Sequence, residues 1–293
     1  MKVLQAAHPA VLLVYFLAVA LVAMFVWNPA IQLLALAGGA GYAFLIRKRG
    51  ELKGDLAFYL LLFLLIAVTN PLFSHNGVTP LFFLNGNPVT KEAIVYGVAI
   101  AGMMLSVLLW CRCYSRIMTS DKFLFLFGKA IPRLSLVLSM ALRFIPLFRR
   151  QMKRVGRAQK TMGLYVSGGY VDRVRGGLRV FSALITWSLE NAMDTAASMK
   201  ARGYGLKGRS HFALFRFDRR DALLLLVSGL LLLLTLCGVG AGLTDFSFYP
   251  TIGELRRSPA AYLTYGTYGA LSFLPFILEI EENLKWTYYR SKA

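Results

Sequence analysis

Long apolar runs alternate with short polar segments along most of this chain. Six runs contain no Asp, Glu, Lys or Arg, and each is long enough to cross a bilayer as a helix. They lie at residues 10–27, 29–46, 56–73, 93–111, 222–243 and 260–278. The first is long for the core of a signal peptide and lacks a small-residue cleavage site, so it is interpreted as a mature span. The pattern predicts an all-α integral membrane protein with about six transmembrane helices.

Positive charge is distributed unevenly between the two sides of these runs. The chain has 33 Lys and Arg residues against 14 Asp and Glu, and all but Lys91, Arg256 and Arg257 fall on the side that holds the N-terminus. Because loops rich in Lys and Arg remain in the cytoplasm, this side is predicted to be cytoplasmic. An even number of spans then places both termini in the cytoplasm and the protein in the cell membrane.

The spans divide the sequence into three predicted parts. These are four N-terminal transmembrane helices, a cytoplasmic or interfacial helical module, and two C-terminal transmembrane helices with a cytoplasmic tail, at residues 1–111, 112–220 and 221–293. The module holds 22 basic residues and only 5 acidic ones.

One apolar stretch of the module, residues 123–148, is long enough to suggest a seventh span. It is interrupted by Lys129, Pro132, Arg133 and Arg143. Charged and helix-breaking residues make burial in lipid costly, so we interpret this stretch as helices at the cytoplasmic interface. A pair of short spans would preserve the same sidedness and stays open as an alternative.

The formal net charge is +19, which on a soluble protein would suggest nucleic-acid binding. Most of the excess lies beside predicted membrane spans, where retention in the cytoplasm and attraction to anionic lipid account for it. The aromatic residues of a nucleic-acid platform are missing from the basic segment. We therefore expect membrane lipid, and no nucleic acid, as a partner.

The interiors of the predicted spans lack ionisable side chains. Ion and proton pathways need such groups at depth, so the bundle is interpreted as a scaffold and not as an ion-coupled carrier. Glycines recur in the spans and are expected to let helices pack closely. The segment 71–90, with three prolines, is predicted to be a loop with frequent turns on the outer side.

Two amphipathic helices are predicted in the second half of the module. The first ends at Gly163, and its narrow apolar stripe consists of Phe148, Met152, Val155, Gln159 and Met162. The second covers residues 170–200 and ends at Gly203, and its apolar side consists of Val174, Leu178, Phe181, Leu184, Ile185 and Leu189. Glycine after a basic last turn is a common signal for a helix C-terminus.

The two helix ends are the candidate binding sites. They comprise Arg157, Lys160, Thr161, Met162 and Gly163 at the first end, and Ala201, Arg202 and Gly203 at the second. Capping alone would account for each glycine, so the functional interpretation depends on the strongly basic setting. An Arg side chain can bind a carboxylate through two hydrogen bonds. Both ends are therefore predicted to dock an acidic surface of a protein partner.

The glycine-rich segment after the second helix resembles nucleotide-binding motifs only superficially. Residues 203–208 satisfy G-x-G-x-x-G, and Arg209 and Ser210 nearly complete a P-loop. Both motifs need a strand before the loop and a helix after it, and here a helix precedes. No grouping of Cys111, Cys113, Cys237 or the histidines predicts a metal or catalytic site, so we expect neither a cofactor nor enzymatic activity in this chain.

The module resembles a known family, the transmembrane T component of energy-coupling factor transporters, which are ABC-class importers of vitamins and metal ions. The similar segments are Arg143-Phe144-Ile145-Pro146, Arg157-Ala158-Gln159, Gly163, Ala201-Arg202-Gly203-Tyr204-Gly205, Arg219-Arg220-Asp221 and Leu284-Lys285-Trp286. They cover residues 130–225 well and the spans by topology alone. The first helix end departs from the family, which usually has Ala-Arg-Gly where this chain has Thr161-Met162-Gly163.

The resemblance implies a mechanism. Two coupling helices would sit in grooves on two cytoplasmic ABC ATPases, which bind ATP and Mg²⁺, and would pass their motion to a substrate-binding S component. Two alternatives stay open: a permease subunit of another ABC importer, and a lipid-binding membrane scaffold.

Overall fold

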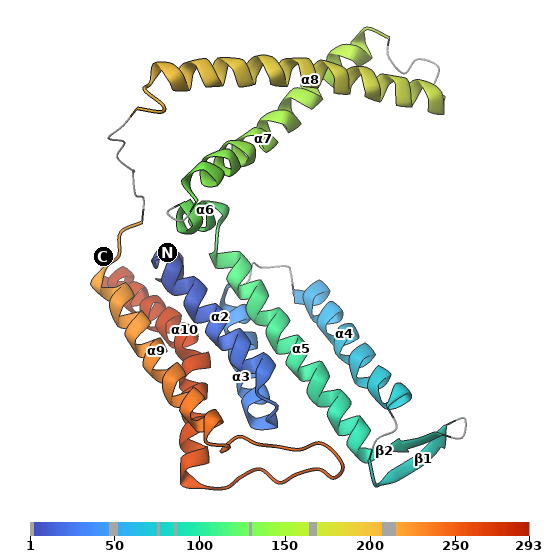
Figure 1. Ribbon diagram of the computed structural model, residues 1–293, viewed down its shortest axis with the longest axis vertical. Coiled ribbons are helices and arrows are strands. Elements are labelled where there is room, and N and C mark those ends of the chain that lie inside the picture. Colours follow the sequence, from blue (N-terminus) through green and yellow to red (C-terminus); the bar gives the residue numbers. More distant parts are fainter. Residues whose placement is uncertain are drawn as a thin grey trace. The chain divides into compact units, whose positions relative to one another are not determined.

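The computed structural model describes residues 3–46, 52–74, 77–84, 87–128, 131–163, 169–206 and 215–292 (Figure 1). Helices dominate these residues, and the predicted all-α membrane architecture is confirmed. The helices are α1 (Val3–Ala6), α2 (Pro9–Phe25), α3 (Pro29–Ile46), α4 (Leu52–Phe73), α5 (Lys91–Ile117), α6 (Ser120–Gly128), α7 (Pro132–Thr161), α8 (Tyr170–Ala201), α9 (Arg219–Gly240) and α10 (Pro259–Lys292). Two short strands, β1 (Pro80–Leu84) and β2 (Asn87–Thr90), complete the described elements.

The chain folds into two compact units. Unit 1 holds residues 1–123 and 215–293, and unit 2 holds residues 124–214. The apolar helices of the two ends of the sequence thus share one unit, while α7 and α8 form another.

Four helices of the described residues are long and apolar enough to cross a membrane: α3, α4, α5 and α9. Helix α2 is apolar but has 17 residues and ends at Phe25, two residues before the end of the predicted run. Helix α10 is a continuous helix of 34 residues that includes the predicted run 260–278. Four of the six predicted spans are supported in this way, and the first and last stay predictions.

The core of unit 1 is rich in aromatic side chains that reach between helices. Trp110 of α5 is buried and donates a hydrogen bond from Nε1 to the Ala35 carbonyl of α3, at 2.9 Å. Tyr15 of α2 donates from its hydroxyl to the Leu271 carbonyl of α10, at 2.6 Å. A buried hydroxyl or indole N–H needs a hydrogen-bond partner, and these two bonds provide one for each side chain. They also hold the helices together.

Several span glycines are positions of close helix contact, as expected. A Cβ on Gly38 would lie 2.9 Å from the Ser272 side chain of α10, and one on Gly97 would lie 2.8 Å from the Ala67 carbonyl of α4. Gly238 of α9 is closed in by Thr264 in the same way. A Cβ on Gly102 or Gly266 would meet nothing within 4 Å, so those two glycines are not contact positions within unit 1.

The predicted outer loop at residues 71–90 contains an antiparallel hairpin, which the turn residues alone did not predict. Strand β1 pairs with β2 from Pro80 opposite Thr90 to Leu84 opposite Asn87. The run Leu81-Phe82-Phe83-Leu84 favours an extended chain, and this preference outweighs the flanking turn residues. Thr90 then caps α5 by accepting a hydrogen bond from the Ala93 N–H. His75 lies outside the described residues.

In unit 2, the apolar stretch 123–148 forms most of α6 and the first half of α7. Helix α7 continues through Pro146 to Thr161, so no separate helix begins at Phe148. Neither α6 nor α7 is among the four helices able to cross a membrane.

Candidate functional site

Helix α8 ends in a complete Schellman motif at the predicted site. Arg202 is the C-cap residue, and Gly203 follows with φ +80°. The Gly203 N–H donates to the Lys200 carbonyl at 3.1 Å, and the Tyr204 N–H donates to the Met199 carbonyl at 3.0 Å. These two bonds satisfy carbonyls that a helix end leaves without partners, so the tip is a defined structure.

Helix α7 ends in the same manner. Met162 is its C-cap residue, with backbone angles close to those of Arg202, and Gly163 follows with φ +88°. The Gly163 N–H donates to the Lys160 carbonyl at 3.2 Å. The predicted ends of both helices are therefore confirmed, although the sequence Thr161-Met162-Gly163 lacks an arginine at the cap position.

The candidate residues of both tips are accessible. Arg157, Lys160 and Arg202 are exposed, and Met162 is 72% exposed. None of the three basic side chains takes part in an ion pair with another described residue. The backbone thus holds a basic residue at each tip while leaving the charged group available to a partner.

The two helices that carry these tips cross within unit 2 (Figure 1). At the contact, the rings of Phe148 in α7 and Trp187 in α8 lie edge to face, with centroids 5.6 Å apart. Val180 and Leu184 of α8 are buried along the same side as Gly176. The tips point away from the crossing in different directions, so the structure keeps them apart and does not combine them into one site.

The predicted apolar side of α8 is largely not the side that packs in unit 2. Of its six residues only Leu184 is buried, at 5% exposure. The other five, Val174, Leu178, Phe181, Ile185 and Leu189, are 44–61% exposed. At 100° per residue, they form a stripe about 140° from the buried positions Gly176, Val180 and Leu184. We call these five residues the apolar stripe of α8.

A second cluster surrounds the point where the chain re-enters unit 1. Asp221, in the first turn of α9, is buried and accepts hydrogen bonds from the backbone N–H groups of His8 and Asp218, at 3.0 and 3.2 Å. Lys122 of α6 is also buried, and its Nζ lies 6.0 Å from the ring centroid of Phe215. Burial lowers the pKa of Lys122, and the nearby charge of Asp221 partly opposes that shift.

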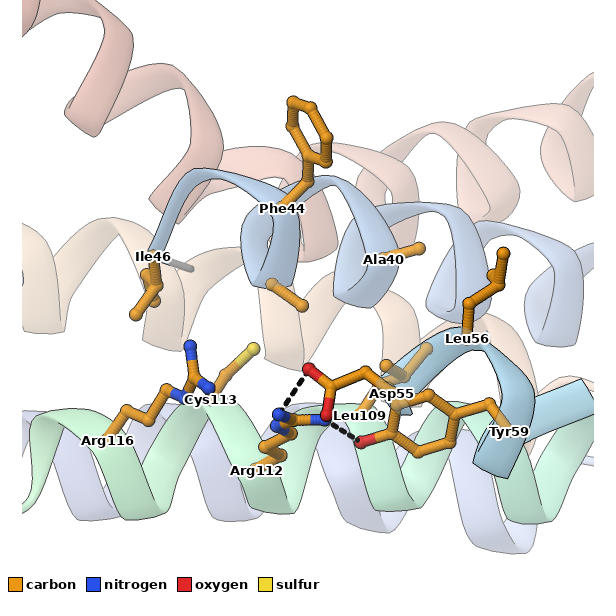
Figure 2. Close-up of a pocket in the computed structure, with 11 residues that line it drawn as sticks. Ala40, Phe44, Ile46, Asp55, Leu56, Tyr59, Leu109, Arg112, Cys113 and Arg116 are labelled. Atoms are coloured by element: carbon orange, nitrogen blue, oxygen red, sulfur yellow. Dashed lines mark hydrogen bonds and ion pairs between the residues drawn. The ribbon is translucent and has the colours of Figure 1, made fainter. Parts of the chain in front are cut away.

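An ion pair that the sequence did not predict joins α4 and α5. Arg112 donates to the carboxylate of Asp55 and, at 3.1 Å, to the hydroxyl of Tyr59 (Figure 2). The sequence placed Asp55 in a loop and Arg112 in the module, because both lie just outside the apolar runs. The spacing of Asp55 and Tyr59, four residues apart, could have shown that they share one face of a helix, but not that this face meets Arg112.

The structure describes only the first part of the glycine-rich segment that resembles nucleotide-binding motifs. Gly203 and Gly205 have positive φ angles of +80° and +99° and follow a helix, as the turn interpretation requires. Residues 207–214, with Gly208, Arg209 and Ser210, lie outside the described residues. Among the residues that the structure describes, no group of three or more His, Cys, Asp or Glu side chains could hold a metal ion.

Comparison with known proteins supplies the family. The family described as CbiQ, cobalt transport protein, matches residues 2–212, which is most of the chain and includes both helix tips. The chain belongs to the CbiQ family. The expected relationship to the transmembrane components of energy-coupling factor transporters is thereby confirmed.

Individual relatives of this CbiQ family member carry a corresponding name. The energy-coupling factor transporter transmembrane protein EcfT of Listeria innocua is 37% identical over 107 residues, which are 34% of this chain and 40% of the relative. EcfT of Lactobacillus helveticus is 31% identical over 114 residues, or 37% of this chain and 41% of the relative. The chain thus spans less than half the length of these curated relatives.

Proposed function

We propose that this chain is the transmembrane coupling subunit, the T component, of an energy-coupling factor importer. It transmits the ATP-driven closure of two cytoplasmic ABC ATPases to a substrate-binding membrane subunit, the S component, which imports a vitamin or a metal ion. ATP and Mg²⁺ bind to the ATPases, and this chain catalyses no reaction. The observation that carries the proposal is a pair of exposed basic helix tips on two crossing helices of one unit.

The α8 tip is the stronger of the two docking sites. Arg202 is held at a helix end whose backbone bonds are internally satisfied, so docking does not require the tip to reorganise. In an ATPase groove its guanidinium would pair with a carboxylate out of contact with water. Removing one partner from such a pair typically costs about 2–5 kcal/mol.

The α7 tip docks by a different balance of forces. Its cap residue, Met162, is flexible and apolar, and it is one of the most exposed apolar side chains of unit 2. Methionine adapts to irregular apolar surfaces, so Met162 packs into an apolar part of the second groove. Lys160 lies two residues before Met162 and Arg157 five residues before it, and these two side chains supply the positive charge.

The apolar stripe of α8 is the surface that we assign to the S component. Five large apolar side chains in a row along a helix face are costly to leave in water. A membrane subunit offers a matching apolar surface, whereas the ATPase grooves are reached by the tips at the helix ends. This arrangement gives each partner its own part of α8.

Two docking tips in one chain favour a T component over the permease of another ABC importer. A permease that forms its own translocation path usually docks through one coupling helix per chain. The tips at Met162 and Arg202 instead provide one contact for each ATPase. A lipid-binding scaffold would need no such tips.

Co-purification from membranes tests the proposal. We expect the unmodified, tagged chain to recover two ATPase subunits and an S component, and Arg202→Glu to lose the ATPases while remaining in the membrane. Arg175→Glu is the matched control, because Arg175 is an exposed arginine near the opposite end of the same helix. Recovery of both ATPases with Arg202→Glu would show that Arg202 does not anchor the chain to them. Recovery of no ATPase with the unmodified chain would favour the lipid-binding scaffold.

A further inference from the structure

The β1–β2 hairpin lies at the end of unit 1 where α4 stops and α5 starts (Figure 1). Both helices are long and apolar enough to cross a membrane, and β2 contacts both of them. The apolar part of α4, Gly54–Phe73, has 20 residues and is therefore about 30 Å long, which matches the hydrocarbon core of a bilayer. The hairpin thus follows α4 at the boundary between acyl chains and headgroups.

A network of hydrogen bonds fixes the base of the hairpin to α5. Glu92 is buried in the first turn of α5, and its carboxylate accepts from the Thr79 hydroxyl at 2.8 Å and from the Thr79 N–H at 3.4 Å. The Lys91 N–H donates to the Thr79 carbonyl at 3.0 Å. Gly77, with φ +133°, passes so close that a Cβ would lie 2.6 Å from the Glu92 carboxylate. These contacts hold the hairpin in a fixed orientation on α5.

The two faces of the hairpin differ in exposure. Val89 of β2 is buried within unit 1. Successive residues of a strand point to opposite faces, so Pro88 points away from the side of Val89. Phe83 of β1 pairs with Pro88 and shares its face, and it is 70% exposed. Leu81, where the register of β1 shifts, is also exposed. The hairpin therefore presents large apolar side chains away from the protein.

The exposed apolar surface of the hairpin continues that of α4. Its large apolar side chains, which we call the hairpin patch, are Leu72, Phe73, Val78, Leu81 and Phe83. Leaving such side chains in water is costly. Helix α4 buries little of its surface inside unit 1, so its side chains contact acyl chains when it spans a bilayer. The hairpin patch extends this lipid-facing surface past the end of the helix, which favours lipid as its occupant.

The backbone of β1 limits how deep the hairpin can lie. Among the described residues the sheet has two strands, so one edge of β1 has no neighbouring strand. Open strand edges do not occur in the hydrocarbon region, because their N–H and C=O groups would lack partners there. Water and headgroups supply those partners at the interface. The backbone therefore belongs among the headgroups, and only side chains reach the acyl chains.

We propose that the hairpin is an interfacial membrane anchor. Its backbone lies among lipid headgroups, and Leu81 and Phe83 insert into the edge of the hydrocarbon layer. Because Thr79 and Glu92 fix the hairpin to α5, this insertion holds the first turn of α5 at one depth in the bilayer. The partner is the bilayer surface itself, and the inference does not depend on the proposed coupling role.

Depth-dependent fluorescence quenching tests the anchor. The full chain, with Cys111, Cys113 and Cys237 replaced by Ala, carries one labelled cysteine and is reconstituted alone into phosphatidylcholine nanodiscs. A dye at Phe83→Cys should be quenched by lipid that is spin-labelled high on its acyl chain, and about threefold less by aqueous iodide than a dye at Glu254→Cys. Glu254 is the control position, because it is exposed and lies between α9 and α10 at the same end of unit 1.

A second variant tests whether Phe83 holds the hairpin in the lipid. With the dye at Leu81→Cys, Phe83→Asp should raise iodide quenching by about threefold, whereas Phe83→Leu should leave it almost unchanged. Iodide quenching at position 83 equal to that at position 254 would overturn the proposal, because the hairpin would lie in water. Protection of position 83 from both quenchers would overturn it too, since a second copy of the chain would cover the patch. So would identical quenching in Phe83→Asp and Phe83→Leu. Helical circular dichroism of every variant confirms that it is folded.

Discussion

Asp221 accepts a hydrogen bond from the backbone N–H of His8, which lies 213 positions earlier in the sequence. The same carboxylate accepts the Asp218 N–H, and its charge lies near the buried Lys122. One side chain therefore joins the start of α2, the start of α9 and the beginning of α6. The beginning of α6 is where the chain leaves unit 1, and the start of α9 follows its return.

Replacing Asp221 with Ala should destabilise unit 1 by about 2–4 kcal/mol, because two backbone N–H groups lose their acceptor and the buried Lys122 loses a nearby negative charge. Asp221→Asn should cost less, since its amide oxygen can still accept one of the bonds. Thermal unfolding in detergent measures both. Equal midpoints for the Ala variant and the unmodified protein would contradict this role.

The lowered pKa of Lys122 makes stability depend on pH. Below its folded-state pKa, Lys122 is protonated in both states and the full cost of the buried charge is present. Between that pKa and the ordinary value of 10.5, the unfolded chain binds more protons, so the free energy of unfolding rises with pH. Relative to Lys122→Met, the unmodified protein should therefore gain stability as pH rises above the folded-state pKa toward 10.5. A constant difference in unfolding midpoint across that range would be evidence against the shift.

Gly203→Ala should loosen the tip of α8. A left-handed residue with a side chain costs about 1 kcal/mol, and the new Cβ would lie 3.1 Å from Leu206. Hydrogen exchange of the Tyr204 amide should then accelerate by about fivefold. Gly177→Ala is the comparison, because that glycine is helical and its Cβ would meet nothing within 4 Å. The same exchange rate at Tyr204 in both variants would show that the positive φ is not what holds the tip.

Gly238→Ala should lower the unfolding midpoint, since its Cβ would overlap the Thr264 side chain and force α9 away from α10. Overpacking of this kind typically costs about 1–3 kcal/mol. Gly266→Ala on α10 has open space and should leave the midpoint almost unchanged. If the two variants unfold alike, α9 and α10 do not rely on close approach at Gly238.

The membrane character and both helix tips could be predicted from the sequence because they depend on local signals. Apolar runs predict spanning helices whatever they pack against, and Gly163 and Gly203 end helices by backbone conformation alone. The polar contacts could not be predicted in this way. The pairing of Asp55 with Arg112, and of Asp221 with His8, depends on which helices become neighbours, and one sequence does not contain that information.

The hairpin and the buried side of α8 are two further features that depend on tertiary contacts and not on local sequence signals. Turn residues around β1 predicted a loop, but pairing with β2 is a tertiary outcome. The apolar pattern of α8 identified a real face of the helix, yet unit 2 packs on Gly176, Val180 and Leu184 instead. A hydrophobic pattern indicates that a face will be covered, and it does not indicate by which molecule.

The contact between Phe148 and Trp187 also sets the proportions of unit 2. Phe148 lies 13 residues before the end of α7 and Trp187 lies 14 residues before the end of α8. At 1.5 Å per residue, each arm from the crossing to its tip is about 20 Å long. A rotation of one helix about the other by roughly 10° would shift a tip by about 3.5 Å on this geometry. The two arms are of nearly equal length, so a relative rotation of α7 and α8 would move both tips by similar distances, and in the proposed coupling role neither ATPase would have a mechanical advantage over the other.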